Sequence, residues 1–403
     1  MNHNIPKIIE KITIGLEKNP IFHDFADYAP FLLAFNQNEF IDKQIDTLKK
    51  IIDKYGMFVK EGDSRYRLTD NYEILFGLVD IYKLNKDNNT LRLLEDLLNI
   101  CLDRFVINNK IISSRNIKSN IPSFRVSYYC YSIVEVLVDM YEITNKTKYL
   151  DTARDIIFKF FKSPFYVKHN LIPLGSYLFF EHPLSRIRFP RTSFIGKNTS
   201  LIFGLIEYYR ITNDSSIKDE LDKIFNSIDK NMVRENVIFR VYRPKGNKRD
   251  SPNLAAAFMY MNMLNRGFYI LKNKVYLERS EAIADIWIKL QSNLGLFPFN
   301  IDGSISWIDS ETDFTIALLE LYELTGNNKY YNAAKKCYDG INKYNLEFSS
   351  VDINTGSPCK NIYLKSYRTT DKFSGLFLKL CYYFENDKQI YGEDGLYSLL
   401  RDR

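Results

Sequence analysis

Histidine and cysteine are scarce in this chain of 403 residues, and their positions argue against a metal site. None of the four histidines stands at metal-ligand spacing with a cysteine. The five cysteines are odd in number and widely spaced, which suits buried free thiols better than a disulfide framework. The sequence also lacks the glycine motifs that bind nucleotides. We therefore expect no metal and no cofactor.

Long hydrophobic runs and linkers are missing as well. The longest apolar stretches, such as 254–264, are shorter than a membrane span. Residues 1–19 mix charges into an apolar pattern and lack the core of a signal peptide, so we expect a cytoplasmic protein. No Pro-, Gly- or Ser-rich linker interrupts the chain, and we expect a single domain over 1–403.

What the chain does have is a phrase that recurs seven times. An apolar helical stretch ends in Leu, Ile or Phe, an Asn- or Asp-containing turn follows, and a second helical stretch begins. The clearest copies run over 136–157 and 318–341. The turns lie about 50 to 70 residues apart, which exceeds the period of the common solenoid repeats. Such a unit cannot bury its apolar face alone, so the copies must pack side by side.

The repeat predicts helical hairpins joined by long return loops. Several returns open with a short β-like piece, as at 55–60, 105–112, 170–180, 236–243 and 295–308. Loops this long in a compact domain usually serve function. We expect first helices near 24–36, 70–84, 126–143, 197–211, 253–272, 311–325 and 371–384. We expect second helices near 39–54, 90–105, 147–162, 216–230, 276–293, 329–343 and 389–401.

A ring of such hairpins, with β-containing returns at one end, resembles the (α/α) toroids of carbohydrate-active enzymes. The phrases LYELTGNNKYYNAA and GLFPF are similar to repeats of those families. The resemblance implies an all-α fold, an (α/α)6–7 toroid that closes with first helices inside. The families include six-hairpin glycosidases, unsaturated glucuronyl hydrolases, N-acylglucosamine epimerases, glucuronyl C5-epimerases and some polysaccharide lyases. Fold alone does not select among their chemistries.

Carboxylates gather where the first helices begin. Any one of them can simply cap a helix or suit its dipole. In a closed ring, however, they would face one cavity, and glycoside hydrolysis needs a carboxylate pair. We expect Asp313 to be the most critical of its cluster, and the catalytic candidates are Asp24, Asp27, Asp70, Glu311 and Asp313. Asp309 precedes that cluster, His23 stands beside the first one, and Asp371 opens the seventh first helix as a substrate-binding candidate.

Cations gather in the returns. As a default they form a solvated basic rim on a chain of net charge +6. Read functionally, their guanidinium groups suit a carboxylate or phosphate of an anionic ligand. No nucleic-acid motif accompanies them, and we expect no nucleic-acid partner. Return 163–196 carries His182, Arg186, Arg188, Arg191 and Lys197; return 231–252 carries Arg240, Arg243, Lys245, Lys248 and Arg249; Arg125 and Arg368 stand before other first helices.

Two aromatic positions are candidates beyond ordinary packing. Trp307 precedes the acidic cluster of the sixth hairpin and could stack on a sugar ring. Tyr128 follows Arg125, and a Tyr–Arg pair is what a lyase or epimerase would use for proton abstraction and carboxylate neutralisation. Core packing is the alternative for both.

The leading hypothesis is a hydrolase of an acidic, uronate-containing glycan that works with paired carboxylates. Two alternatives remain open. One is a uronate epimerase or polysaccharide lyase that uses Tyr128, His182 or His23 with arginine neutralisation. The other is a non-catalytic scaffold, for which an open array with a smooth concave face would argue.

Overall fold

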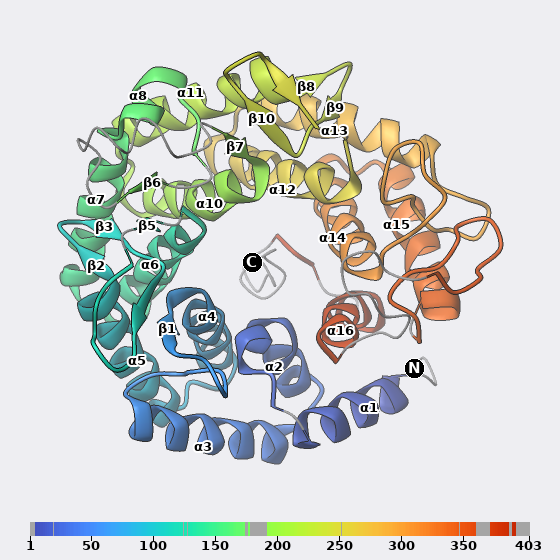
Figure 1. Cartoon of the computed structure of the whole chain (residues 1–403). Helices are drawn as coiled ribbons and strands as arrows, with labels where there is room; N and C mark the ends of the chain where they lie inside the picture. The colour runs from blue at the N-terminus through green and yellow to red at the C-terminus, as the bar shows by residue number, and fades with distance from the viewer. Residues whose placement is uncertain are drawn as a thin grey trace. The chain divides into compact units, whose positions relative to one another are not determined.

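The structure is a computed structural model, built from α-helices with short strands between them (Figure 1). It describes residues 5–18, 20–123, 125–126, 128–173, 176–177, 192–250, 252–345, 347–359, 371–386 and 389–391. The chain divides into two compact units. Unit 1 comprises Met1–Pro20, Val233–Arg240 and Asp250–Asp402, and unit 2 comprises Ile21–Met232, Val241–Arg249 and Arg403.

In unit 2 the predicted hairpins form two rows of helices. Each first helix packs against the first helix of the next hairpin, and each second helix packs on the first helix of its own hairpin. The first helices are α2 (Phe25–Ala34), α4 (Leu68–Asn85), α6 (Ile133–Thr144) and α10 (Ile195–Thr212). The second helices are α3 (Asn38–Tyr55), α5 (Asn88–Phe105), α7 (Thr147–Phe161) and α11 (Ser215–Met232).

The two rows differ in how the sequence is buried. Most residues of α4 are buried around its whole circumference, as expected for a helix enclosed by neighbours. In α3 burial is confined to one stripe that includes Ile41, Ile45, Leu48 and Ile52, at spacings of three and four residues. The first helices therefore form the inner row of the unit and the second helices the outer row.

Unit 1 repeats this arrangement. Its first helices are α12 (Leu254–Leu271), α14 (Ile308–Thr325) and α16 (Asp371–Glu385), and each packs against the next. Its second helices are α13 (Lys274–Lys289) and α15 (Asn328–Gly340), which the π-helix η3 (Ile341–Asn345) extends. A helix that the sequence reading missed, α1 (Ile5–Lys18), packs against α16. Of the second helix predicted at 389–401, residues 389–391 are not helical and the rest lies outside the described residues.

The Asn-rich turns act as helix caps. The first helices α6 and α10 end at Asn145 and Asn213 in the left-handed conformation, which asparagine tolerates better than most residues. The next helices often begin with a side-chain cap, as when Asp87 accepts hydrogen bonds from the backbone of Asn89 and Thr90. The turns predicted from the repeat are thus explained by backbone chemistry.

The described parts of the returns hold short antiparallel strands and further short helices. Strands occur within 105–112, 170–180 and 236–243, as predicted, but 55–60 forms none and 295–308 only isolated bridges. The pairs are β1 (Arg65–Arg67) with β4 (Ser114–Asn116), β2 (Val106–Ile107) with β3 (Lys110–Ile111), β5 (Arg125–Val126) with β6 (Ser176–Tyr177), and β8 (Val233–Arg234) with β9 (Val237–Ile238). A three-stranded sheet has the order β11 (Lys248–Arg249), β10 (Val241–Arg243), β7 (Ser193–Phe194). The short helices are η1 (Phe22–Asp24), η2 (Tyr128–Ser132) and α8 (Pro164–His169).

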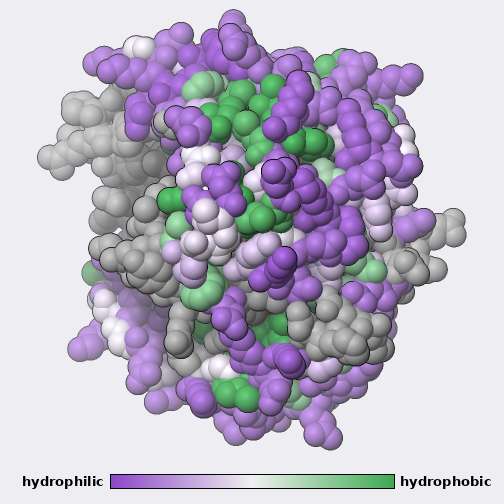
Figure 2. Space-filling view, turned by 90° about the vertical axis from the view of Figure 1, so that its right-hand side faces the viewer, coloured by the Kyte–Doolittle hydropathy of each residue, from purple (hydrophilic) through white to green (hydrophobic). Residues whose placement is uncertain are grey.

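Hydrophilic residues cover most of the face shown in Figure 2, and hydrophobic residues appear between them. The large hydrophobic side chains that are most exposed come from separate elements, for example Ile14 from α1, Val167 from α8 and Val275 from α13. Within the described residues, no helix combines the length and the apolar character that crossing a membrane requires.

Candidate functional site

Three of the predicted aspartates lie in unit 2 around the starts of α2 and α4, which pack against each other. Asp24 ends η1 and is half-buried. Asp27 and Asp70 are buried, with 6% and 9% of their surface exposed. Asp70 Oδ1 lies 3.7 Å from Lys60 Nζ, which partly offsets its negative charge. The backbone of Phe25 and Ala26 lies against Gly77 in the middle of α4, so Asp27 lies further along this helix pair than Asp70.

Tyr28 belongs to this group, although the sequence reading did not single it out. It is fully buried, and burial, followed by the negative charges of Asp24 and Asp27, raises the pKa of its hydroxyl well above the ordinary value. The phenol therefore stays protonated and can donate a hydrogen bond. The sequence offered one signal. Tyr28 lies eight positions before the left-handed residue that follows its helix, and the equivalent residues of α4 and α6 are Leu78 and Leu137.

An ion pair precedes Asp70 along the chain. Arg67, the last residue of β1, places Nε 2.6 Å from Asp63 Oδ2. The hydrogen bond lowers the pKa of Asp63 and raises the pKa of Arg67, and the charge of Asp70 adds to the second shift. The N-terminal end of α4 therefore combines carboxylates with cations.

The acidic cluster of the sixth hairpin lies in unit 1 at the start of α14. Asp309 is in the first turn, and Asp313 follows in the second turn, one turn later than the sequence reading placed it. Asp313 is 6% exposed. Trp307 is half-buried just before the helix, and its ring lies edge-on to that of Phe299 at 5.2 Å between centroids. Part of its surface is thus used for packing.

Glu311 has a structural contact that sequence reasoning did not foresee. It is fully buried, and its Oε1 accepts a hydrogen bond of 2.8 Å from the backbone N–H of Phe297. Asn71 and Asn198 occupy the same fourth position of α4 and α10. Each also accepts a backbone N–H of the preceding return, Asn71 from Phe58 and Asn198 from Ile172.

This contact has a sequence signature. Two positions before each N–H donor stands a residue in the left-handed conformation, namely Gly56, Asn170 and Gly295. The same motif thus recurs in three hairpins. It consists of a left-handed residue, two apolar residues after it, and a polar side chain at the fourth position of the following first helix. Glu311 thus holds its return in place through this hydrogen bond.

For three candidates the structure describes the backbone and not the side chains. Arg125 is in β5, Tyr128 opens η2 and Asp371 opens α16, with only their backbone described. Arg243 is described, and its side chain is exposed on β10. The candidates that lie outside the described residues are His182, Arg188, Arg191 and Arg368.

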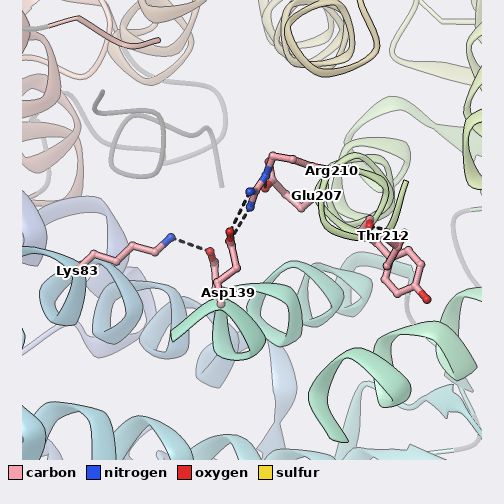
Figure 3. Close-up of polar contacts among 7 residues, drawn as sticks. Lys83, Asp139, Glu207, Arg210 and Thr212 are labelled. Atoms are coloured by element: carbon pink, nitrogen blue, oxygen red, sulfur yellow. Dashed lines mark hydrogen bonds and ion pairs between the residues drawn. The ribbon is translucent and has the colours of Figure 1, made fainter. Parts of the chain in front are cut away.

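A buried layer of charge was missed altogether. On five first helices, the residue six positions before the left-handed C-cap carries a charge. Each of these five side chains is buried, with no more than 2% of the residue exposed. In unit 2, Lys83 Nζ lies 2.7 Å from Asp139 Oδ1, and Arg210 Nε lies 2.8 Å from Glu207 Oε2 (Figure 3). The five residues are Asp80, Asp139 and Glu207 in unit 2, and Arg266 and Glu320 in unit 1.

Arg210 also joins two neighbouring first helices. Its Nη1 and Nη2 donate to Oε1 and Oε2 of Glu142 on α6, at 2.8 and 2.5 Å. Burial alone would lower the pKa of Arg210, but the contacts with Glu142 and Glu207 raise it. The pairs Lys83–Asp139 and Arg210–Glu142 therefore tie neighbouring first helices of unit 2 together. Over the described residues, no group of three or more histidine, cysteine or carboxylate side chains is arranged to hold a metal ion.

No protein-family model and no curated protein matches the sequence. Solved structures do match. D-mannose isomerase superposes with a TM-score of 0.63 at 11% identity, over 79% of this chain and 86% of that one. Cellobiose 2-epimerase from Bacillus thermoamylovorans B4167 gives 0.62 at 13% identity, over 81% and 90%. An unsaturated glucuronyl hydrolase specific for heparin gives 0.51 at 13% identity, over 79% and 85%.

These likenesses confirm the fold class predicted from the repeat, the all-α toroid of helical hairpins. They hold at identities of 11% to 13%, where the fold is shared and the active-site residues need not be.

Proposed function

We propose that this protein is a carbohydrate-active enzyme, a glycoside hydrolase that acts on an acidic, uronate-containing glycan. The observation that carries the proposal is the shared fold, because the matching structures include glucuronyl hydrolase and sugar epimerases alike. The carboxylates at the starts of first helices add chemistry that suits a hydrolase.

The proposed reaction needs two carboxyl groups, one to protonate the leaving oxygen and one to act as base or nucleophile. Asp27 and Asp70 are the candidates in unit 2, and Asp313 is the candidate in unit 1. All three are at least nine-tenths buried, so the reaction would run where little bulk water enters. Lys60 and Arg67 beside Asp70 are suited to a sugar carboxylate.

The test is hydrolysis of a panel of oligosaccharides that contain glucuronate or galacturonate, with neutral glucose oligomers of equal length as the comparison. Release of reducing ends from the acidic set alone is the expected result. Equal turnover of neutral and acidic substrates would contradict the proposed specificity, and no turnover of any member would contradict the hydrolase.

A sugar epimerase or isomerase is the second candidate, because the TM-scores of 0.62 and 0.63 belong to such enzymes. An epimerase removes a proton from carbon and returns one from solvent. Incubation of the same panel in D₂O therefore distinguishes the two reactions. Deuterium on a ring carbon without new reducing ends would favour the epimerase. The absence of both deuterium and new reducing ends would favour a non-catalytic scaffold.

A further inference from the structure

In three return loops an isolated bridge closes on a proline that is the later residue of the pair, and in one of them the bridge encloses a longer segment. An isolated antiparallel bridge to a proline joins Arg115 to Pro122, Val351 to Pro358 and Phe239 to Pro252. The first two pairs are separated by seven positions and the third by thirteen. The segment that the bridge encloses in the return after α11 is thus six residues longer than the segments enclosed in the returns after α5 and α15.

The extra residues form a strongly basic hairpin. Residues 241–249 contain β10 and β11, and Arg243 lies directly opposite Lys248 across the strand pair. Arg243, Lys245 and Lys248 are exposed. Within the described part of the chain none of the three has an ion-pair partner. Like charges placed opposite each other destabilise a strand pair, so the hairpin pays a cost in stability for its charge.

The two shorter bridged segments show that a bridge of this kind closes without these cations. Next to the bridge, Asn116 and Asp352 each use Oδ1 to accept two backbone N–H groups of the turn. Such a turn stabilises itself through a short polar side chain. In the longer bridged segment Arg240 follows the bridge residue Phe239, and the tip is closed by a hydrogen bond from Asn247 N–H to the Pro244 carbonyl. Its exposed charges therefore call for another explanation.

One arginine of the hairpin is structural. Arg249 Nε donates to the carbonyl of Asn231 at 2.6 Å, and its guanidinium lies over the ring of Tyr242 at 5.4 Å. Arg115 makes the equivalent contact with the carbonyl of Arg104. Arg249 thus anchors the hairpin, which leaves Arg243, Lys245 and Lys248 to present their charge to solvent.

The hairpin also joins the two arginine-rich returns. In the sheet β10 pairs with β7, and Tyr242 is in register with Ser193. Strand β7 ends the return 163–196, and in the sequence Arg191 stands two positions before Ser193. Strands from two returns that are far apart along the chain therefore pair in one sheet.

We propose that this hairpin is a binding surface for an acidic polysaccharide chain, which it holds by its carboxylates. The proposal rests on the proposed function, since it supplies a contact for the same class of substrate. A nucleic acid is the less fitting polyanion. The aromatic residue of the hairpin, Tyr242, is only 7% exposed and lies beneath Arg249, so it cannot serve as a stacking platform for bases.

The experiment measures the affinity of the full chain for polygalacturonate, with dextran and a single-stranded 20-nucleotide DNA as comparisons. The test variant carries Arg243→Glu and Lys248→Glu. The matched control carries Arg92→Glu and Lys218→Glu, which make the same charge change at exposed positions of α5 and α11. The test variant should bind polygalacturonate about tenfold more weakly, a loss of about 1.4 kcal/mol. The control should bind as the unmodified chain does.

Binding to polygalacturonate should also weaken with salt, and less steeply in the test variant than in the control. Should the reversed pair impair folding, Arg243→Gln with Lys248→Gln removes the charge and keeps most of the side-chain volume. Unchanged affinity in either folded variant overturns the proposal, and so does tighter binding of DNA than of polygalacturonate. Loss of binding in a protein that hydrolyses no glycan would reject the hydrolase and leave this surface supported.

Discussion

Two carboxylates on α14, Glu311 and Asp313, differ in what surrounds them. Glu311 is bound to the backbone N–H of Phe297 and shares this contact by register with two asparagines. Asp313 has no counterpart of this kind, because Glu73 and Ser200 stand at its register in α4 and α10. A residue that varies among equivalent positions is free to serve chemistry, whereas a repeated contact serves the fold.

Replacing Asp313 by Asn should therefore abolish most activity without unfolding the protein. The change keeps the shape and removes the charge, and a lost general acid or base costs on the order of 10²–10⁴ in rate. Turnover of the acidic oligosaccharides and a melting curve are the two measurements. Asp302→Asn is the matched control, because Asp302 is exposed in the preceding return. Full turnover in a folded Asp313→Asn protein would show that the assignment is wrong.

At Glu311 the expectation is reversed. Glu311→Gln keeps an oxygen that can accept the Phe297 N–H, so the protein should fold with nearly its original stability. Glu311→Ala leaves that buried N–H unsatisfied, which costs about 1–3 kcal/mol. Urea denaturation of both variants measures the difference in the free energy of unfolding. Equal destabilisation by Gln and Ala would contradict a hydrogen-bonding role.

Among the elements, the first helices carry a layer of buried charge six residues before their C-caps. Burying a charge is costly unless a partner and hydrogen bonds compensate it. Lys83 and Arg210 supply such partners from positions one turn closer to the helix C-terminus, where a cation also suits the helix dipole. The pairing of a charge on one helix with a charge on the next fixes the register between neighbouring hairpins.

Removal of one partner from this layer should be strongly destabilising. Lys83→Met removes the cation that lies 2.7 Å from the carboxylate of Asp139, a residue that is 1% exposed. The expected loss is about 3–5 kcal/mol in the free energy of unfolding. The surface pair Lys329–Asp285 provides the control, with side chains 42% and 43% exposed, and Lys329→Met should cost less than about 1 kcal/mol.

The double variant Lys83→Met with Asp139→Leu completes this test. It removes both charges of the pair and should recover much of the lost stability, because apolar replacements of a whole buried pair are often neutral. Urea denaturation of the single and double variants gives the coupling directly. Single variants that cost no more than the surface control would show that the layer is not held by these charges.

For the whole molecule, the course of the chain bears on the prediction of one domain. Unit 1 is assembled from three segments, and residues 241–249, which belong to unit 2, lie between two of them. Neither unit is thus one continuous stretch of sequence, and in a repeat array neighbouring elements depend on one another for burial. Both features favour unfolding as one cooperative event.

We therefore expect a single thermal transition. The calorimetric enthalpy should equal the van't Hoff enthalpy, and far-ultraviolet circular dichroism should change together with tyrosine and tryptophan fluorescence. Trp287 and Trp307 are both in unit 1, so fluorescence excited at tryptophan reports on that unit. A tryptophan transition well separated from the circular dichroism transition would contradict the single domain.

The sequence by itself determined the helical hairpins, their Asn-rich caps and the fold class, because these follow from local periodicity and backbone preference. It also placed Asp27, Asp70 and Asp313 near the starts of first helices. The tertiary structure decided what each carboxylate touches. Glu311 and Asp313 are indistinguishable in a string of letters, and only packing of the return against α14 gives the first a backbone partner.

The tertiary structure also decided the partners in the buried charge layer and the pairing of β10 with β7. Both join residues from different hairpins, such as Lys83 with Asp139 and Tyr242 with Ser193. Contacts between residues about 50 positions apart depend on how hairpins stack, and no local pattern encodes that. Periodicity fixes which elements form, whereas the side-chain partners are fixed only when the elements are packed.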